Sequence, residues 1–142
     1  MFHVGATIIT LSKGETEAAE ELDYARFIHK NLPDFLRISK GKDQESVISF
    51  PAMDSKMRAL ASTEDAGIGF GGATQVNLDE FEYHPFAEKN YAEIKPMIDA
   101  GGQLIIMSTA DQTKVNTKFK ELYRGAKKGD NNFFPVFLPY NV

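Results

Sequence analysis

The sequence predicts an α/β domain with a mostly parallel sheet, flanking helices and one antiparallel hairpin. Short β-branched runs alternate with amphipathic helical segments, which is the order expected for strands joined by crossover helices. Two further apolar runs in the first half lie on either side of a proline-containing turn, which indicates a hairpin at one edge of the sheet. The chain has 142 residues, enough for a buried core, so we expect a single domain over 1–142.

The first strand and helix follow each other directly. Residues 4–11 are a short β-branched run, which predicts a buried strand. Residues 12–15 have the Ser-x-x-Glu spacing of a capping box, so we expect a helix to begin there and to end before Pro33. One apolar stripe at three- and four-residue steps supports this helix: Ala18, Leu22, Ala25, Ile28 and Leu32.

The remaining elements are predicted from shorter patterns. Residues 46–50 and 57–61 are expected to form the hairpin, and residues 67–72 are a glycine-rich loop. A strand is predicted in the run from 73 to 80, followed by a helix over 87–95 that Pro96 breaks and by a strand over 104–107. The next helix is marked by Val115, Phe119, Leu122 and Tyr123 and ends near Gly125. A last strand is predicted over 133–138.

The run from 73 to 80 is unusually polar for a central strand. A strand buried on both faces is nearly all apolar, yet Thr74, Gln75 and Asn77 interrupt this one. Two explanations are open. Either one face of the strand is uncovered, or an element that would pack there is missing.

Two predicted strands end in reactive residues, Asp79-Glu80 and Ser108-Thr109. Ligands of α/β sheets bind at the carboxyl ends of the strands, where these pairs are expected to lie. Neighbouring side chains of a strand point to opposite faces, so one carboxylate can hold Mg²⁺ through water while the other orients an attacking water. The alternative is a solvated acidic strand end.

The Ser-Thr pair also has two interpretations. The hydroxyls of Ser108 and Thr109 are placed to bond the terminal phosphate of a nucleotide or Glu80. Alternatively, they cap a helix over 112–124, a role that Asp111 would also serve. The sequence leaves both interpretations open.

Composition excludes several classes of protein and site. The net charge of −4 argues against a wholly basic nucleic-acid-binding surface. Absence of cysteine excludes disulfides and thiolate metal sites, and no apolar run reaches the roughly 20 residues of a membrane span. A phosphate-binding Gly-Lys-Ser/Thr loop is also missing, because no Lys-Ser/Thr follows the glycines of residues 67–72. A local positive surplus lies in the last third: Lys114, Lys118, Lys120, Arg124, Lys127 and Lys128.

Residues 78–85, 101–110 and 132–140 together resemble the large terminase subunit of tailed bacteriophages, the ATP-driven motor that packs and cuts viral DNA. The resemblance runs from about Gly5 onward and implies part of a P-loop (ASCE-type) NTPase domain, from after the Walker A loop to the last core strand. It would make Asp79 the Walker B acid that holds Mg²⁺ through water, and Glu80 the catalytic carboxylate. Residues 108–110 would be the coupling motif, with Ser108 and Thr109 at the nucleotide. The cofactors implied are ATP and Mg²⁺.

The sequence departs from the terminase pattern at several points. No Walker A loop precedes Gly5, the approach over residues 67–70 lacks an arginine, Asn77 replaces an apolar residue and Tyr140 replaces a tryptophan. The nuclease domain is absent from this chain, so no cutting activity is assigned. We expect weak or no ATP turnover from the isolated chain, since the missing loop carries much of the phosphate binding.

The resemblance implies double-stranded DNA, the portal and the small terminase subunit as partners. It also implies a phage- or prophage-encoded protein in the cytoplasm of a bacterial host, with no membrane partner. A second hypothesis is an interaction module or prophage remnant that keeps the fold, lacks ATP hydrolysis and self-associates. A third is a different metal-dependent phosphotransfer or nuclease site at Asp79, Glu80 and Asp111.

Overall fold

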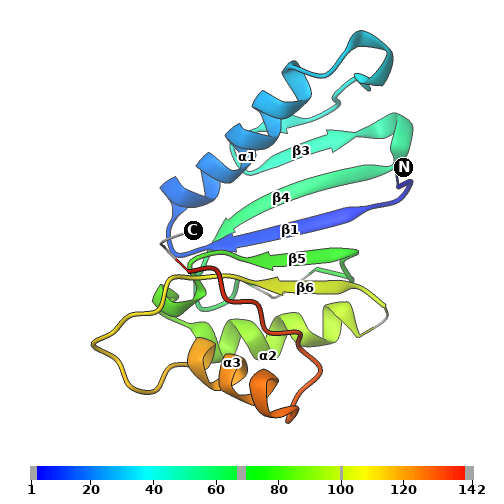
Figure 1. Ribbon diagram of the computed structural model, residues 1–142. Helices are drawn as coiled ribbons and strands as arrows, with labels where there is room; N and C mark the ends of the chain where they lie inside the picture. Colours follow the sequence, from blue (N-terminus) through cyan, green and yellow to red (C-terminus); the bar gives the residue numbers. More distant parts are fainter. Residues whose placement is uncertain (1–2, 67–69, 100, 140–142) are drawn as a thin grey trace.

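A mixed β-sheet forms the centre of the molecule and helices lie on both of its faces (Figure 1). The computed structural model describes residues 3–66, 70–99 and 101–139. Across the sheet, the six strands of these residues have the order β2-β3-β4-β1-β5-β6. The strands are β1 (Thr7–Ser12), β2 (Asp43–Gln44), β3 (Val47–Phe50), β4 (Ser55–Ala61), β5 (Gln75–Leu78) and β6 (Gln103–Ile106); the α-helices are α1 (Glu15–Lys30), α2 (Ala87–Ile98) and α3 (Lys118–Lys128); the 3-10 turns are η1 (Asp34–Leu36), η2 (Pro51–Met53) and η3 (Phe81–Tyr83).

The strands that carry the candidate site are parallel. β1 lies between β4 and β5 and runs parallel to both, and β5 runs parallel to β6. In this register Leu11 is level with Leu78, and Leu78 is level with Ile106. The carboxyl ends of β1, β5 and β6 therefore meet at one edge. The antiparallel pairing of β3 with β4 confirms the predicted hairpin, whereas β2 is too short to have been predicted.

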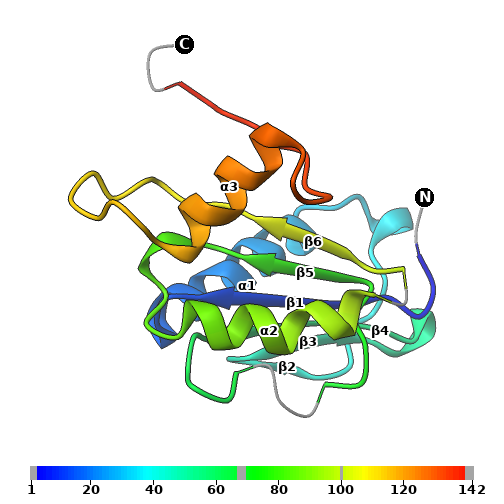
Figure 2. The ribbon, with the colours of Figure 1, turned by 90° about the horizontal axis from the view of Figure 1, so that it is seen from below.

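Different helices cover the two faces (Figures 1 and 2). α1 packs on β4 and β1, and its Ala18 and Leu22 are buried against Ile48 and Ala59. α2 packs on β5 and β6 over the other face. The larger apolar core lies on this second face, to which α3 contributes one residue: Ile9, Leu11, Ala66, Val76, Leu78, Phe81, Ile94, Met97 and Leu122.

The polar residues of β5 lie on the face that α2 does not cover. Val76 and Leu78 point into the core and are fully buried. Gln75 and Asn77 alternate with them and stay half-buried. The Gln75 amide donates to Asn77 Oδ1 at 2.7 Å, and Asn77 Nδ2 donates to Thr10 Oγ1 at 3.3 Å. This face of β5 is therefore only partly covered, and its polar groups bond to one another.

The capping box predicted at residues 12–15 is wrong. Ser12 is the last residue of β1, and its buried hydroxyl has no hydrogen-bond partner. Gly14 occupies the cap position of α1 and no side chain caps this helix. The reason is that β1 continues one residue further than predicted, which turns the Ser12 side chain into the sheet. At the other end of α1, Ile28 is 62% exposed and does not extend the buried stripe.

Two helix boundaries also differ from the prediction. α2 continues through Pro96 to Ile98, and the buried side chains of Ile94 and Met97 hold its last turn against the core. Proline prevents a hydrogen bond to the carbonyl four residues earlier, so this packing offsets a cost of about 3 kcal/mol. α3 begins only at Lys118 and passes through Gly125, and a left-handed Gly129 ends it.

The last strand, predicted over 133–138, is wrong: the structure assigns no strand there. A strand needs a hydrogen-bonded neighbour, and no ladder pairs this segment within the described residues. Phe133 packs against the larger core beside Tyr91, whereas the later apolar side chains are exposed: Phe134, Val136, Phe137 and Leu138. Tyr140 and residues 67–69 of the predicted glycine loop lie outside the described residues.

Candidate functional site

Asp79 and Glu80 lie in the turn that directly follows β5, at the carboxyl edge of the sheet. Both residues are half-buried. The Asp79 amide donates to the carbonyl of Leu11 at 2.8 Å, which continues the pairing of β5 with β1. Glu80 has left-handed backbone angles, φ 51° and ψ 37°. The strand alternation expected for this pair is therefore wrong, since β5 ends at Leu78 and the backbone reverses at Glu80.

Glu21 of α1 faces Asp79, a neighbour that the sequence did not predict. Burial and then the negative charge of Asp79 raise the pKa of the Glu21 carboxyl. The negative charge of Asp79 thus acts on a carboxyl group of α1. No sequence pattern distinguishes Glu21 from the other acidic residues of its helix.

His84 bonds to the backbone of the acidic turn. Its Nε2 lies 2.8 Å from the carbonyl oxygen of Asp79, and its ring contacts Phe81 edge-on at 5.2 Å between centroids. Burial lowers the pKa of His84, so the ring is neutral and Nε2–H donates to the carbonyl. Through this bond the ring fixes the backbone of the turn.

Ser108 lies beside the acidic turn, whereas Thr109 makes no side-chain bond to it. The Glu82 amide donates to Ser108 Oγ at 3.1 Å, and the Ser108 hydroxyl donates to the Thr109 carbonyl at 3.0 Å. The amide of Phe81 donates to the carbonyl of Met107 at 3.2 Å. Thr109 itself is exposed. The two strand ends are therefore joined, through Glu82 rather than through the Glu80 carboxylate that the sequence suggested.

The helix-capping interpretation of Ser108, Thr109 and Asp111 is wrong. α3 is capped by Thr117, whose side chain accepts from the amide of Lys120 at 3.3 Å. Asp111 accepts from the amide and hydroxyl of Thr113, at 2.9 and 2.6 Å. The hydroxyl bond first and the amide bond second lower the pKa of Asp111. Asp111 therefore closes its own turn.

Glu82 is the carboxylate that sequence reasoning missed. Its side chain is fully buried, with Lys120 Nζ at 3.1 Å and the Asp111 amide at 3.2 Å from Oε1. The Thr117 hydroxyl donates to Oε2. Glu82 is the third residue after Asp79, but its partners lie roughly 30 to 40 residues further on, so no local pattern indicated this burial.

Most cations of the last third are also engaged. Lys118 pairs with Glu88 at 3.3 Å and with Glu121 at 2.8 Å, and Arg124 donates to the carbonyl of Val115 at 3.0 Å. The side chains of Lys118 and Lys120 are only 14% and 16% exposed. The ion pairs of these two lysines hold α3 in place, so their charges do not form part of a freely solvated helix face.

The acidic turn fits part of a magnesium site. Mg²⁺ commonly keeps several waters and binds one or two protein carboxylates together with substrate phosphates. Within residues 3–66, 70–99 and 101–139, no hydrogen bond occupies the carboxylates of Asp79 or Glu80, and no three ligating side chains form a complete metal site. The two carboxylates are therefore open to a ligand, and any cation held here would need further groups beyond the described side chains.

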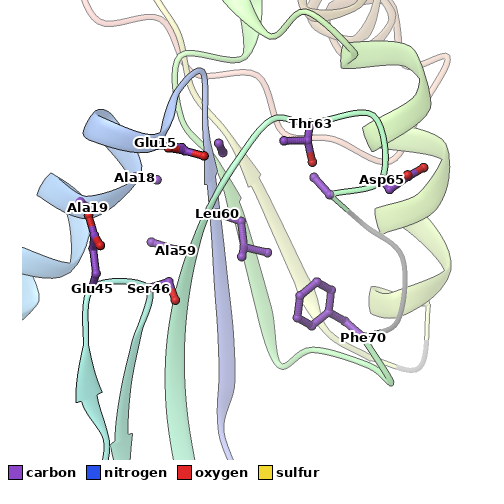
Figure 3. A pocket seen from close by; sticks show the side chains of 12 residues that line it. Glu15, Ala18, Ala19, Glu45, Ser46, Ala59, Leu60, Thr63, Asp65 and Phe70 are labelled. Carbon is purple, nitrogen blue, oxygen red and sulfur yellow. The ribbon is translucent and has the colours of Figure 1, made fainter.

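A cavity of about 520 Å³ lies further along the same edge, beside the end of β4 (Figure 3). Glu15, Glu45 and Asp65 give it an acidic rim, and Leu60 and Phe70 supply apolar surface. None of the four predicted site residues lines this cavity. The candidate site is therefore an open edge of the sheet rather than this cavity.

Solved structures with the same fold include two bacteriophage large terminases. The large terminase of bacteriophage HK97 matches 99% of this chain, with a TM-score of 0.71 and 13% identity. The large terminase ATPase domain of Thermus phage P74-26 matches 84%, with a TM-score of 0.61 and 16% identity. This chain spans 30% of the HK97 protein and 53% of the P74-26 domain. No protein-family model and no curated protein sequence matches the chain.

Proposed function

We propose that this chain supplies the magnesium-holding and water-activating part of a DNA-packaging ATPase. The observation that carries the proposal is the meeting of the Asp79-Glu80 turn and Ser108 at the carboxyl edge of a sheet with the large terminase ATPase fold. By the same resemblance, the intact motor would work on double-stranded DNA together with a portal and a small terminase subunit.

Each residue has a distinct role in this proposal. Asp79 binds a water of the magnesium shell, and bound Mg²⁺ would supply the charge that neutralises phosphate oxygens in the transition state. Glu80 accepts a hydrogen bond from the attacking water and polarises it. Ser108 and Thr109 are the sensor of the terminal phosphate. The neutral ring of His84 holds the Asp79 carbonyl and thereby keeps the acidic turn in position.

Asp79, Glu80, Ser108 and Thr109 supply no group that grips the phosphates of a nucleotide. The sheet ends at β6, whose outer edge has no partner within the described residues. A parallel strand that pairs with β6 and leads into a Gly-Lys-Ser/Thr loop would place backbone amides beside Ser108. We therefore expect the isolated chain to turn over ATP at well below about 1 s⁻¹, the lower end of ordinary enzymes.

Glu80→Gln tests the catalytic role. The genomic DNA upstream of the Met1 codon is searched for an in-frame Gly-x-x-x-x-Gly-Lys-Ser/Thr segment, and that segment is co-expressed with the chain. Mg²⁺-dependent ATP hydrolysis is then measured. We expect Glu80→Gln to lower kcat at least about 100-fold, because the amide is a much weaker base toward water.

Glu121→Gln is the matched control, since Glu121 is an exposed acid of α3 and contacts only Lys118 among the ion pairs of the described chain. It is expected to keep full activity. The proposal fails if the complemented protein hydrolyses ATP equally well with Gln at position 80. It also fails if the upstream DNA encodes an unrelated protein and no complementing segment restores hydrolysis.

A second candidate function is that of an interaction module. Two features favour it: the edge of β6, which has no partner strand among the residues that the structure describes, and the exposed apolar side chains of residues 134–138, since such surfaces promote association. Light scattering distinguishes the two functions. A monodisperse monomer at high protein concentration would contradict self-association.

A further inference from the structure

The Glu82 carboxylate is buried in a place where burial is costly. Its side chain has no exposed surface, although the residue lies in a turn at the edge of the sheet. A carboxylate removed from water is destabilising by several kcal/mol unless charged and hydrogen-bonding partners replace the water. Three donors satisfy this requirement: the Asp111 amide, the Thr117 hydroxyl and Lys120 Nζ.

All three donors come from one later segment of the chain. Asp111 lies in the loop after β6, Thr117 is the cap of α3, and Lys120 belongs to the first turn of that helix. Lys120 also donates to the carbonyls of Asp111 and Lys114, so one ammonium group gathers the whole loop around the carboxylate. The position of this loop therefore depends on where Glu82 lies.

The backbone of Glu82 bonds to the candidate site, just as its side chain bonds to the loop after β6. Its amide donates to Ser108 Oγ, and the neighbouring Phe81 amide donates to the Met107 carbonyl. Glu80, two residues earlier, holds the left-handed turn that fixes the direction of the chain. An unbroken series of bonds therefore connects the turn at Glu80, through Glu82, to the donors of residues 111–120.

We propose that Glu82 is a positioning residue that connects the Asp79-Glu80 turn to residues 108–117 and to the start of α3. This rests on the proposed function, in which nucleotide binds at the turn: a change at Glu80 would then reach α3 through Glu82. Energetic coupling of this kind is reciprocal, so altering Lys120 must also perturb Asp79 and Glu80.

The test is hydrogen exchange on the full chain without nucleotide, with Glu82→Gln and Lys120→Met as variants and Glu121→Gln as control. In both variants we expect amide exchange in residues 109–117 to become at least about tenfold faster, because each loses a charged hydrogen bond. Amides of β1 and β5 keep their protection. In NMR spectra, Lys120→Met shifts the Asp79 and Glu80 amides, whereas Glu121→Gln leaves them in place.

Two results would overturn the inference. One is unchanged exchange in residues 109–117 of the Glu82→Gln variant. The other is faster exchange throughout the sheet, which would mean that Glu82 only contributes to global stability. Because the assay contains no nucleotide, its outcome is separate from that of the ATP hydrolysis experiment. Localised loss of protection in a chain that never supports hydrolysis would retain the connection and reject the ATPase proposal.

Discussion

Glu80 combines an unfavourable backbone with a carboxylate that no described group uses. A left-handed conformation at a residue other than glycine costs on the order of 1–3 kcal/mol and persists only where the surroundings enforce it. Here the Tyr83 amide donates to the Glu80 carbonyl at 2.8 Å, and the flanking amides of Asp79 and Phe81 bond to Leu11 and Met107. The turn thereby presents the Glu80 side chain at the edge of the sheet.

His84 makes a prediction about pH at the same scale. Its pKa is lowered in the folded chain, so the unfolded chain binds a proton first as the pH falls below about 6.5. The stability that neutral His84 contributes is therefore complete above this pH and is lost as the pH falls further. We expect His84→Gln, whose amide can donate to the Asp79 carbonyl, to make the free energy of unfolding less dependent on pH between about 7 and 5.

Urea unfolding at several pH values measures this effect. The quantity compared is the slope of the free energy of unfolding against pH in each protein. The absolute stabilities are not compared, since the glutamine packs less well against Phe81 than the ring does. Parallel slopes for wild type and His84→Gln would show that His84 is not the group responsible.

Among the elements, α3 depends on its cap more than α1 does. The Thr117 side chain accepts from the Lys120 amide and donates to buried Glu82, whereas the Ser12 hydroxyl before α1 has no partner. We expect Thr117→Ala to lower the free energy of unfolding by about 1–3 kcal/mol, through a lost cap and an unsatisfied carboxylate oxygen.

Ser12→Ala is the matched hydroxyl deletion. It removes a buried polar group that bonds to nothing, so the free energy of unfolding should stay within about 0.5 kcal/mol or rise. Denaturant melts of the two variants decide the question. A loss of about 1 kcal/mol in Ser12→Ala would restore the capping box and contradict the position of Ser12 in β1.

At the scale of the whole molecule, helices lie on both faces of the sheet, and within the described residues the edge at β6 has no neighbouring strand. The segment 133–138 has the composition of a strand and, from Phe134 on, exposes its apolar side chains, with Phe134 89% and Leu138 84% exposed. A molecule with both features presents a strand edge and an apolar segment to other chains.

We expect the double variant Phe134→Ser/Leu138→Ser to weaken self-association at high concentration while leaving the midpoint of thermal unfolding almost unchanged. Both side chains are nearly free of contacts, so their removal does not open the core. Sedimentation velocity measures the first effect and calorimetry the second. A large drop in the melting temperature would mean that the segment packs on the domain.

The sequence by itself determined the α/β class, the hairpin and the position of the two reactive strand ends, because hydrophobic periodicity and the succession of elements along the chain can be recognised locally. It predicted Asp79, Glu80, Ser108 and Thr109 as candidates, and the structure brings Ser108 to the acidic turn while leaving Thr109 exposed. Whether these residues hold magnesium or activate water stays a prediction.

Only the tertiary structure decided which polar groups are buried and paired. No sequence pattern distinguishes Glu82 from the other acidic residues. In the structure its partners come from residues 111–120, and its side chain has no exposed surface. The start of α3 at Lys118 and the unpaired state of residues 133–138 have the same origin. A carboxylate finds its donors, and a strand its neighbour, through contacts distant in sequence, which no local pattern contains.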